Sequence, residues 1–330
     1  MPGFDEILGQ EPIKAYMKNA LLRRQVSHAY IISGEKGMGK RMLANALAMA
    51  LLCDEGSGEA CGMCHSCLQF VTGNHPDITW VTHEKASIGV DEIRDQLVDP
   101  MLIKPYHSRY KIYIVDEAEL LTVQAQNALL KTIEEPPEYG VVMLLTTNPE
   151  AFLQTIRSRC TMLKMMPLDG ELIRTILTEK GIDAEQAKRC AAFSRGNLGK
   201  AIELAGSEAF REMYDLLVGM LSKIDKAELS EMMDFIKKLK ENELDNASTL
   251  DFIELWYRDV LFYKATGADD RLVFCGERDV IRNISGKLEY RQGEKILEAI
   301  GQARTRLAAN VNFETTMELV LLTMKGEKSL

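Results

Sequence analysis

Residues 29–52 read AYIISGEKGMGKRMLANALAMALL, and this stretch decides the fold. The apolar run 29–32 is typical of a short buried strand, and the apolar stretch 42–52 is typical of a helix. Between them lies a turn with the spacing G-x-x-x-x-G-K, from Gly34 to Lys40. A strand, a glycine-rich turn and a helix in this order predict a loop whose backbone N–H groups wrap around nucleotide phosphates.

The loop departs from its usual pattern at one position. The residue after the lysine is normally Ser or Thr, whose hydroxyl holds Mg²⁺, but here it is Arg41. The loop glycines Gly34, Gly37 and Gly39, together with Lys40, still favour an anion. Arg41 could pair with a phosphate but cannot bind Mg²⁺. We therefore expect a site for ATP or ADP, working or vestigial, with a weak dependence on Mg²⁺.

Two further strands are predicted downstream, within KIYIVDEAE (111–119) and GVVMLLTTN (140–148), with a helix over 123–134 between them. Continuous apolar strands separated by helices indicate a parallel sheet covered on both faces. Ligands of such sheets bind at the carboxyl ends of the strands. Asp116, Glu117 and Asn148 follow these strands, so we expect them to converge on the glycine-rich loop.

Each of these polar residues has two interpretations. Asp116 could orient a Mg²⁺ shell and Glu117 could polarise an attacking water, or both could simply cap the next helix. Asn148 could sense the outer phosphate, or it could form a routine turn before Pro149.

Four of the seven cysteines fall within fifteen residues, at Cys53, Cys61, Cys64 and Cys67. Four thiolates at this spacing predict a tetrahedral zinc site. An iron–sulfur cluster is an alternative, and a nearby histidine (His65 or His75) could replace one cysteine. No additional polar group stands out as catalytic, so we expect a structural role for the metal.

Composition excludes several classes of protein. The 330 residues are 46% apolar and 27% charged, which is ordinary for a soluble globular chain of two or three domains. No apolar run is long enough for a membrane span, so we expect a cytoplasmic protein with no membrane contact. The net charge of −9 argues against a broad nucleic-acid surface, so DNA contact would need a local patch or partner subunits.

Several motifs together resemble the AAA+ clamp-loader subunits of bacterial replicative DNA polymerase, and most closely the delta-prime subunits. They are ILGQ (7–10), SHAYIISGEKGMGK (27–40), the four cysteines, VDEAELLTVQAQNALLKTIEEPP (115–137), LLTTN (144–148) and TIRSRC (155–160). The resemblance implies an AAA+ α/β domain over 1–167 with a zinc module at about 53–67. A small helical lid over 168–206 and an all-α oligomerising collar over 207–330 would follow.

The resemblance also assigns roles. It implies that Arg159, which taken alone is one surface arginine among several, is an arginine finger that reaches the ATP site of a neighbouring subunit. It implies a hetero-pentamer with gamma/tau and delta subunits, which loads the sliding clamp on primed DNA. Arg41, and Gly199 at the arginine position of a G-x-x-R-x-A lid motif, favour the delta-prime type, for which we expect no ATPase activity of its own.

Two alternatives stay open. Lys40, Asp116 and Glu117 are retained, so the chain could be an ATP-hydrolysing subunit of gamma/tau type. It could also be an AAA+ adaptor that acts outside replication.

Overall fold

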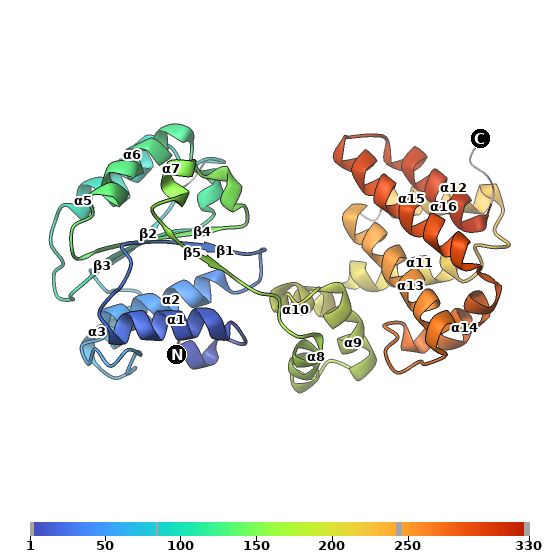
Figure 1. Ribbon diagram of the computed structural model, residues 1–330, viewed down its shortest axis with the longest axis horizontal. Helices are drawn as coiled ribbons and strands as arrows, with labels where there is room; N and C mark the ends of the chain where they lie inside the picture. The colour runs from blue at the N-terminus through green and yellow to red at the C-terminus, as the bar shows by residue number, and fades with distance from the viewer. Residues whose placement is uncertain (1–2, 84, 242–245, 327–330) are drawn as a thin grey trace. The chain divides into compact units, whose positions relative to one another are not determined.

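The computed structural model describes residues 3–83, 85–241 and 246–326 (Figure 1). Its contacts divide the chain into two compact units. The first comprises residues 1–168 with 197–200, and the second comprises 169–196 with 201–330. The separate lid and collar expected from the sequence remain a prediction.

The first unit is built on a five-stranded sheet with the order β2-β3-β4-β1-β5. Every neighbouring pair of strands is parallel, and Ile31 in β1 lies opposite Leu144 in β4 on one side and Met162 in β5 on the other. This confirms the predicted α/β fold of AAA+ type. The strands are β1 (Ala29–Ser33), β2 (Ile78–Val81), β3 (Lys111–Val115), β4 (Gly140–Thr146) and β5 (Thr161–Lys164).

Helices cover both faces of this sheet, as Figure 1 shows. Side chains of β1 alternate between two apolar cores, so that Ile31 belongs to one core and Ile32 to the other. One face carries α1 (Glu11–Leu22), α2 (Lys40–Leu52) and α3 (His65–Val71), and the other carries α5 (Asp99–Met101), α6 (Val123–Glu134) and α7 (Gln154–Arg157). The short helix α4 (Val90–Ile93) and a π-helical turn, Arg94–Val98, precede α5.

The described part of the second unit is entirely helical. Its core includes an aromatic cluster in which Phe193 stacks on Phe252 at 5.1 Å between ring centroids, while Phe274 lies 5.0 Å from Phe252. The helices are α8 (Gly170–Glu179), α9 (Ala184–Phe193), α10 (Leu198–Gly206), α11 (Glu208–Leu221), α12 (Leu229–Glu241), α13 (Asn246–Thr266), α14 (Arg278–Lys287), α15 (Tyr290–Ala308) and α16 (Phe313–Lys325). The first three residues of α10, 198–200, belong to the first unit.

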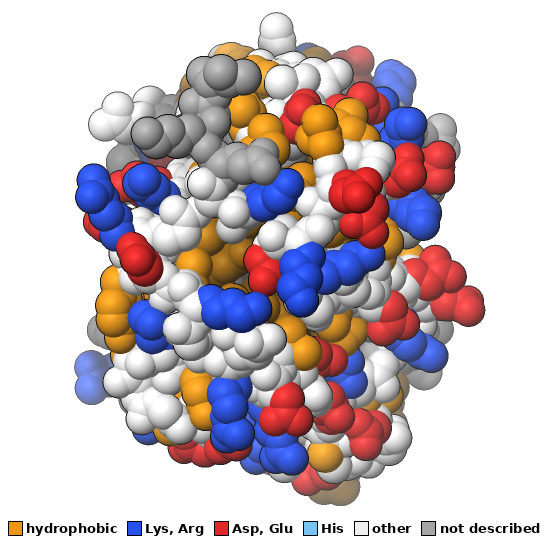
Figure 2. Space-filling view, turned by 90° about the vertical axis from the view of Figure 1, so that its right-hand side faces the viewer, with side chains coloured by type: hydrophobic (Ala, Val, Ile, Leu, Met, Phe, Trp, Pro, Cys, Tyr) orange, Lys and Arg blue, Asp and Glu red, His pale blue; other side chains and the backbone are white. Residues whose placement is uncertain are grey.

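Polar side chains set where several of these helices begin. Thr122, Asp169, Asp183 and Ser207 each accept a hydrogen bond from a backbone N–H in the first turn of the helix that follows. On the face of the second unit seen in Figure 2, Lys and Arg side chains are interspersed with Asp and Glu. No described helix has the length and apolar character needed to cross a membrane.

Candidate phosphate pocket, metal centre and exposed arginine

The glycine-rich loop joins the end of β1 to the start of α2. Gly37 and Gly39 have φ values of 89° and 92°, which favour glycine because a side chain would be strained there. Gly39 is the N-cap of α2, so Lys40 and Arg41 occupy its first turn. The loop therefore presents a helix N-terminus and two cationic side chains to the same space, an arrangement that favours an anion.

Lys40 is held by its own loop. Its Nζ donates to the carbonyl oxygens of Gly34, at 2.7 Å, and Glu35, at 3.0 Å. Burial lowers the pKa of this ammonium, although nearby carboxylates, first among them Glu119, act in the opposite direction. A phosphate that recruits Lys40 must therefore replace two hydrogen bonds.

Arg41 contacts two elements that follow α2 in the chain. Its Nε lies 3.4 Å from Oδ2 of Asp116, just after β3, and its Cζ lies 4.7 Å from the centroid of the Trp80 ring on β2. The Arg41 side chain is 68% exposed and that of Asp116 is 29% exposed. The acid expected to orient Mg²⁺ is thus paired with a guanidinium.

A pocket of about 380 Å³ lies beside the loop. Of the residues predicted for the nucleotide site, it brings together Gly37, Gly39, Lys40, Arg41, Asp116 and Glu117. Gly34 and Asn148 are not among its lining residues, and the Asn148 side chain instead accepts the backbone N–H of Glu150. Asn148 thus caps the turn that begins at Pro149, and its role as a sensor of the outer phosphate stays a prediction.

Glu119, which was not among the residues predicted for this site, also lines the pocket. Its carboxylate accepts hydrogen bonds from the hydroxyl of Thr147, at 2.5 Å, and from the backbone N–H of the same residue. Burial alone would raise the pKa of Glu119, but these donors hold it below its usual range. Its position three residues after Asp116, beyond the strand, is the one signal that could have suggested it.

Residues 197–200 belong to the first unit and lie against the loop. The Asn197 side chain donates to the carbonyl of Lys36 at 2.7 Å, and the Gly199 N–H donates to the carbonyl of Gly37 at 3.2 Å. A Cβ at Gly199 would lie 2.5 Å from that Gly37 oxygen. The backbones approach so closely because position 199 has no side chain.

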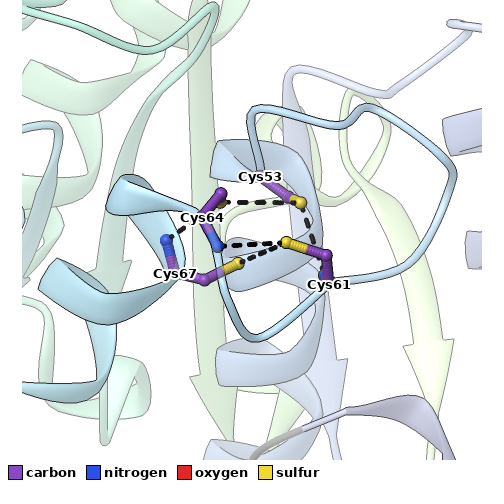
Figure 3. Close-up of side chains that lie close together, drawn as sticks. All are labelled: Cys53, Cys61, Cys64 and Cys67. Atoms are coloured by element: carbon purple, nitrogen blue, oxygen red, sulfur yellow. Dashed lines mark hydrogen bonds between the residues drawn. The ribbon is translucent and has the colours of Figure 1, made fainter.

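The four predicted cysteines come together in space (Figure 3). Cys53 follows α2, Cys61 lies in the connecting loop, Cys64 is the N-cap of α3 and Cys67 lies within that helix. All four sulfur atoms are within 4.8 Å of one another, and the pairs Cys53–Cys64 and Cys61–Cys67 are each 4.0 Å apart. Sulfurs bound tetrahedrally to zinc lie about 3.8 Å apart, so this cluster can hold a structural zinc ion.

Backbone N–H groups around the cluster favour the thiolate form of its cysteines. The N–H groups of Cys61, Cys64 and Cys67 point at sulfurs of the cluster, at 3.3 to 3.4 Å. Backbone N–H groups, first that of Met63, lower the pKa of Cys61 to about 7, whereas burial raises the pKa of Cys67. Donors aimed at sulfur stabilise the deprotonated ligands that a metal requires.

Neither histidine considered as a replacement ligand is needed. The buried His75 ring accepts the N–H of Asp77 at 3.1 Å and lies 3.2 Å from the Ser108 hydroxyl. The His65 ring packs edge-on against that of His107, with centroids 5.8 Å apart. The donor set is therefore the four cysteines, a set typical of structural zinc.

Arg159 lies just before β5 and is exposed. One Nη donates to the carbonyl of Thr155 at 3.0 Å, and the other lies 3.1 Å from the carboxylate of Glu134, the last residue of α6. Burial raises the pKa of the adjacent Cys160 to about 12, so this cysteine is a neutral thiol packed against one of the two sheet cores.

Comparisons with known proteins find relatives among the subunits of DNA polymerase III. The family described as DNA polymerase III, delta subunit, matches residues 9–169. The DNA polymerase III subunit delta' of Bacillus subtilis is 30% identical over 325 residues, which are 96% of this chain and 97% of that relative. The tau subunit of the same organism is 29% identical over 92% of this chain, and the match spans 58% of that relative's length. A solved structure, a DNA polymerase III gamma-subunit-related protein of Thermotoga maritima, is 19% identical with a TM-score of 0.42 and covers 97% of this chain and 99% of its own.

Proposed function

The chain belongs to the DNA polymerase III clamp-loader family, and from this premise we propose that it acts there as a subunit of delta-prime type. In this role it assembles in the cytoplasm with gamma/tau and delta subunits in a hetero-pentamer that loads the sliding clamp on primed DNA. It donates Arg159 to the ATP site of a neighbour and does not hydrolyse ATP itself. Its zinc ion stabilises the fold.

The observation that carries the proposal is the pairing of Arg41 with Asp116 in the phosphate pocket. Hydrolysis in this class of site needs Mg²⁺ bound by a loop hydroxyl and by the acid after the next strand. Here the loop hydroxyl is missing, because residue 41 is arginine, and the acid, Asp116, is paired with that same arginine. Gly199 also supports a subunit that does not hydrolyse ATP. An arginine at this position could not be accommodated unless the loop backbone moved.

Arg159 is suited to act outside its own chain. Its side chain is 40% exposed and its partner Glu134 is 44% exposed. An ion pair this exposed contributes only about 0–1 kcal/mol, so the guanidinium can turn toward a neighbour at small cost. An arginine finger contributes on the order of 10³-fold or more to phosphoryl transfer at the site it enters.

The test is Arg159→Ala in the reconstituted complex. We expect a loss on the order of 10³-fold in turnover at the neighbouring site, and reduced clamp loading, with assembly unchanged by size-exclusion chromatography. Arg174→Ala is the matched control, since Arg174 is also half-exposed and paired with an acid on its own helix. Wild-type ATPase activity in the assembled Arg159→Ala variant would rule out the role.

A second candidate is an ATPase of gamma/tau type, which the retention of Lys40, Asp116 and Glu117 beside the pocket favours. Steady-state ATP hydrolysis by the isolated chain, abolished by Lys40→Ala, would establish it. We expect no such turnover.

A further inference from the structure

The residues of the phosphate pocket are not suited to hold the Mg²⁺ ion that nucleotide sites with this loop motif normally bind. Position 41 carries a guanidinium, which has only donor groups and repels a cation. Its Nε lies 3.4 Å from the carboxylate of Asp116, the other group expected to hold the metal shell. Both protein contributions to a Mg²⁺ site are therefore lost, one by substitution and the other by pairing.

The Arg41 guanidinium is placed so that it can contact Asp116 and a bound phosphate at the same time. It uses Nε toward Asp116 and one face toward the Trp80 ring, 4.7 Å away. The contacts within the described residues leave its two Nη groups free of hydrogen bonds, and its side chain is 68% exposed beside the pocket. A guanidinium can hold a carboxylate with one edge and phosphate oxygens with another. This is the bridging role that a divalent cation performs between an acid and a phosphate.

The charges of the pocket agree with this role. Its lining carries three cationic side chains, Lys36, Lys40 and Arg41, and three acids, Asp116, Glu117 and Glu119. Because Arg41 already offsets the charge of Asp116, a polyphosphate can enter beside Lys40 without bringing a metal to screen that acid. The entering phosphate must still displace Lys40 from its two loop carbonyls.

We propose that this pocket binds the polyphosphate group of a nucleotide without a divalent cation, with Arg41 bridging Asp116 and the phosphate in place of the metal. The inference deepens the proposed function, because a bound nucleotide with no metal would be held rather than cleaved. The ligand of the retained loop would then be free ATP or ADP rather than their Mg²⁺ complexes. Mg²⁺ in solution then competes for the phosphate instead of assisting it.

Trp80 supplies the readout for the isolated chain. Its ring is half-buried against Arg41, while the only other tryptophan, Trp256, is fully buried in the second unit. Titration with ATP, ADP and inorganic tripolyphosphate, in EDTA and in Mg²⁺, should change Trp80 fluorescence, and calorimetry gives the affinity independently. We expect wild-type affinity in EDTA to equal or exceed that in Mg²⁺, and tripolyphosphate to bind more weakly than ATP if the nucleoside contributes.

Arg41→Thr restores the usual loop and is the decisive variant. It should lose at least about tenfold in affinity in EDTA and recover on addition of Mg²⁺, and Lys40→Ala should weaken binding in both conditions. Arg41 is exposed, so both proteins should fold alike, which circular dichroism checks. The proposal is overturned if wild-type binding requires Mg²⁺, if Arg41→Thr binds like wild type in EDTA, or if no phosphate ligand binds at all. None of these results would alter the outcome of the Arg159 experiment, which is read in the assembled complex.

Discussion

At the scale of single residues, Asp77 illustrates how much one buried carboxylate can organise. It is fully buried before β2, and its two oxygens accept the backbone N–H groups of Tyr106, His107 and Ser108 at 2.6 to 2.9 Å. Burial alone would raise the pKa of Asp77, but these three donors hold it below the ordinary value of 3.8. One side chain thus ties the segment leading into β3 to the edge of the sheet.

Asp77→Asn should destabilise the first unit by about 1–3 kcal/mol at neutral pH, because a neutral amide accepts these hydrogen bonds less well and leaves a buried donor. The sign of the pH effect follows from the lowered pKa. The carboxylate stabilises the fold above about pH 4 and loses this effect as pH falls through the folded-state pKa. Stability of the variant should therefore vary less with pH in this acidic range.

Chemical denaturation of both proteins between about pH 3 and pH 7 checks this expectation. Asp95→Asn is the matched control, because Asp95 is exposed and should change neither the stability nor its pH dependence. Identical acid profiles for wild type and Asp77→Asn would contradict the assignment.

At the scale of elements, the start of α10 packs closely against the glycine-rich loop through Gly199. Gly199→Ala should destabilise the first unit by about 1–3 kcal/mol, because the new Cβ would lie 2.5 Å from the carbonyl oxygen and 2.7 Å from the Cα of Gly37. Thermal unfolding measures the loss. Gly206→Ala in the same helix meets nothing within 4 Å and should be neutral or stabilising. Equal effects of the two substitutions would show that the loop contact contributes nothing.

Which elements could be predicted from sequence follows from how they are buried. The three central strands β1, β3 and β4 are buried along their whole length, so each is a continuous apolar run. The strands β2 and β5 lie at the sheet edges and are only partly buried, so ITWV and TMLK carry no comparable run. These two strands were not predicted for that reason.

How much of each site could be predicted depends on whether its residues are close together in the sequence. The cysteine cluster could be predicted because its four ligands are local in sequence. The contacts of Arg41 with Trp80 and of Arg159 with Glu134 could not be predicted. Trp80 and Glu134 reach these arginines only through the packing of distant elements. Asp116 and Glu117 could be placed near the loop from the parallel sheet alone, since its strands end at one edge.

At the scale of the whole molecule, the chain has two units with separate sources of stability. The first relies on the two sheet cores and, we expect, on zinc at the cysteine cluster. The second relies in part on the aromatic cluster, in which Phe274 contacts Phe193, Tyr214, Phe252 and Trp256. Ring pairs of this kind contribute about 0.5–1.5 kcal/mol each beyond the area they bury.

We therefore expect two perturbations to act on different units. Removing zinc with a chelator, or replacing Cys64 with Ser, should lower the unfolding temperature of the first unit, because the folding free energy of such a module includes metal binding. Phe274→Ala should instead destabilise the second unit by about 3–5 kcal/mol through the cavity it leaves. Calorimetry resolves the two effects, and metal analysis should give one zinc per chain in wild type and none in Cys64→Ser. Cys275→Ser, at a half-buried cysteine outside the cluster, should keep the zinc. A metal-free wild-type chain that unfolds as the zinc-loaded one does would contradict the structural role of the metal.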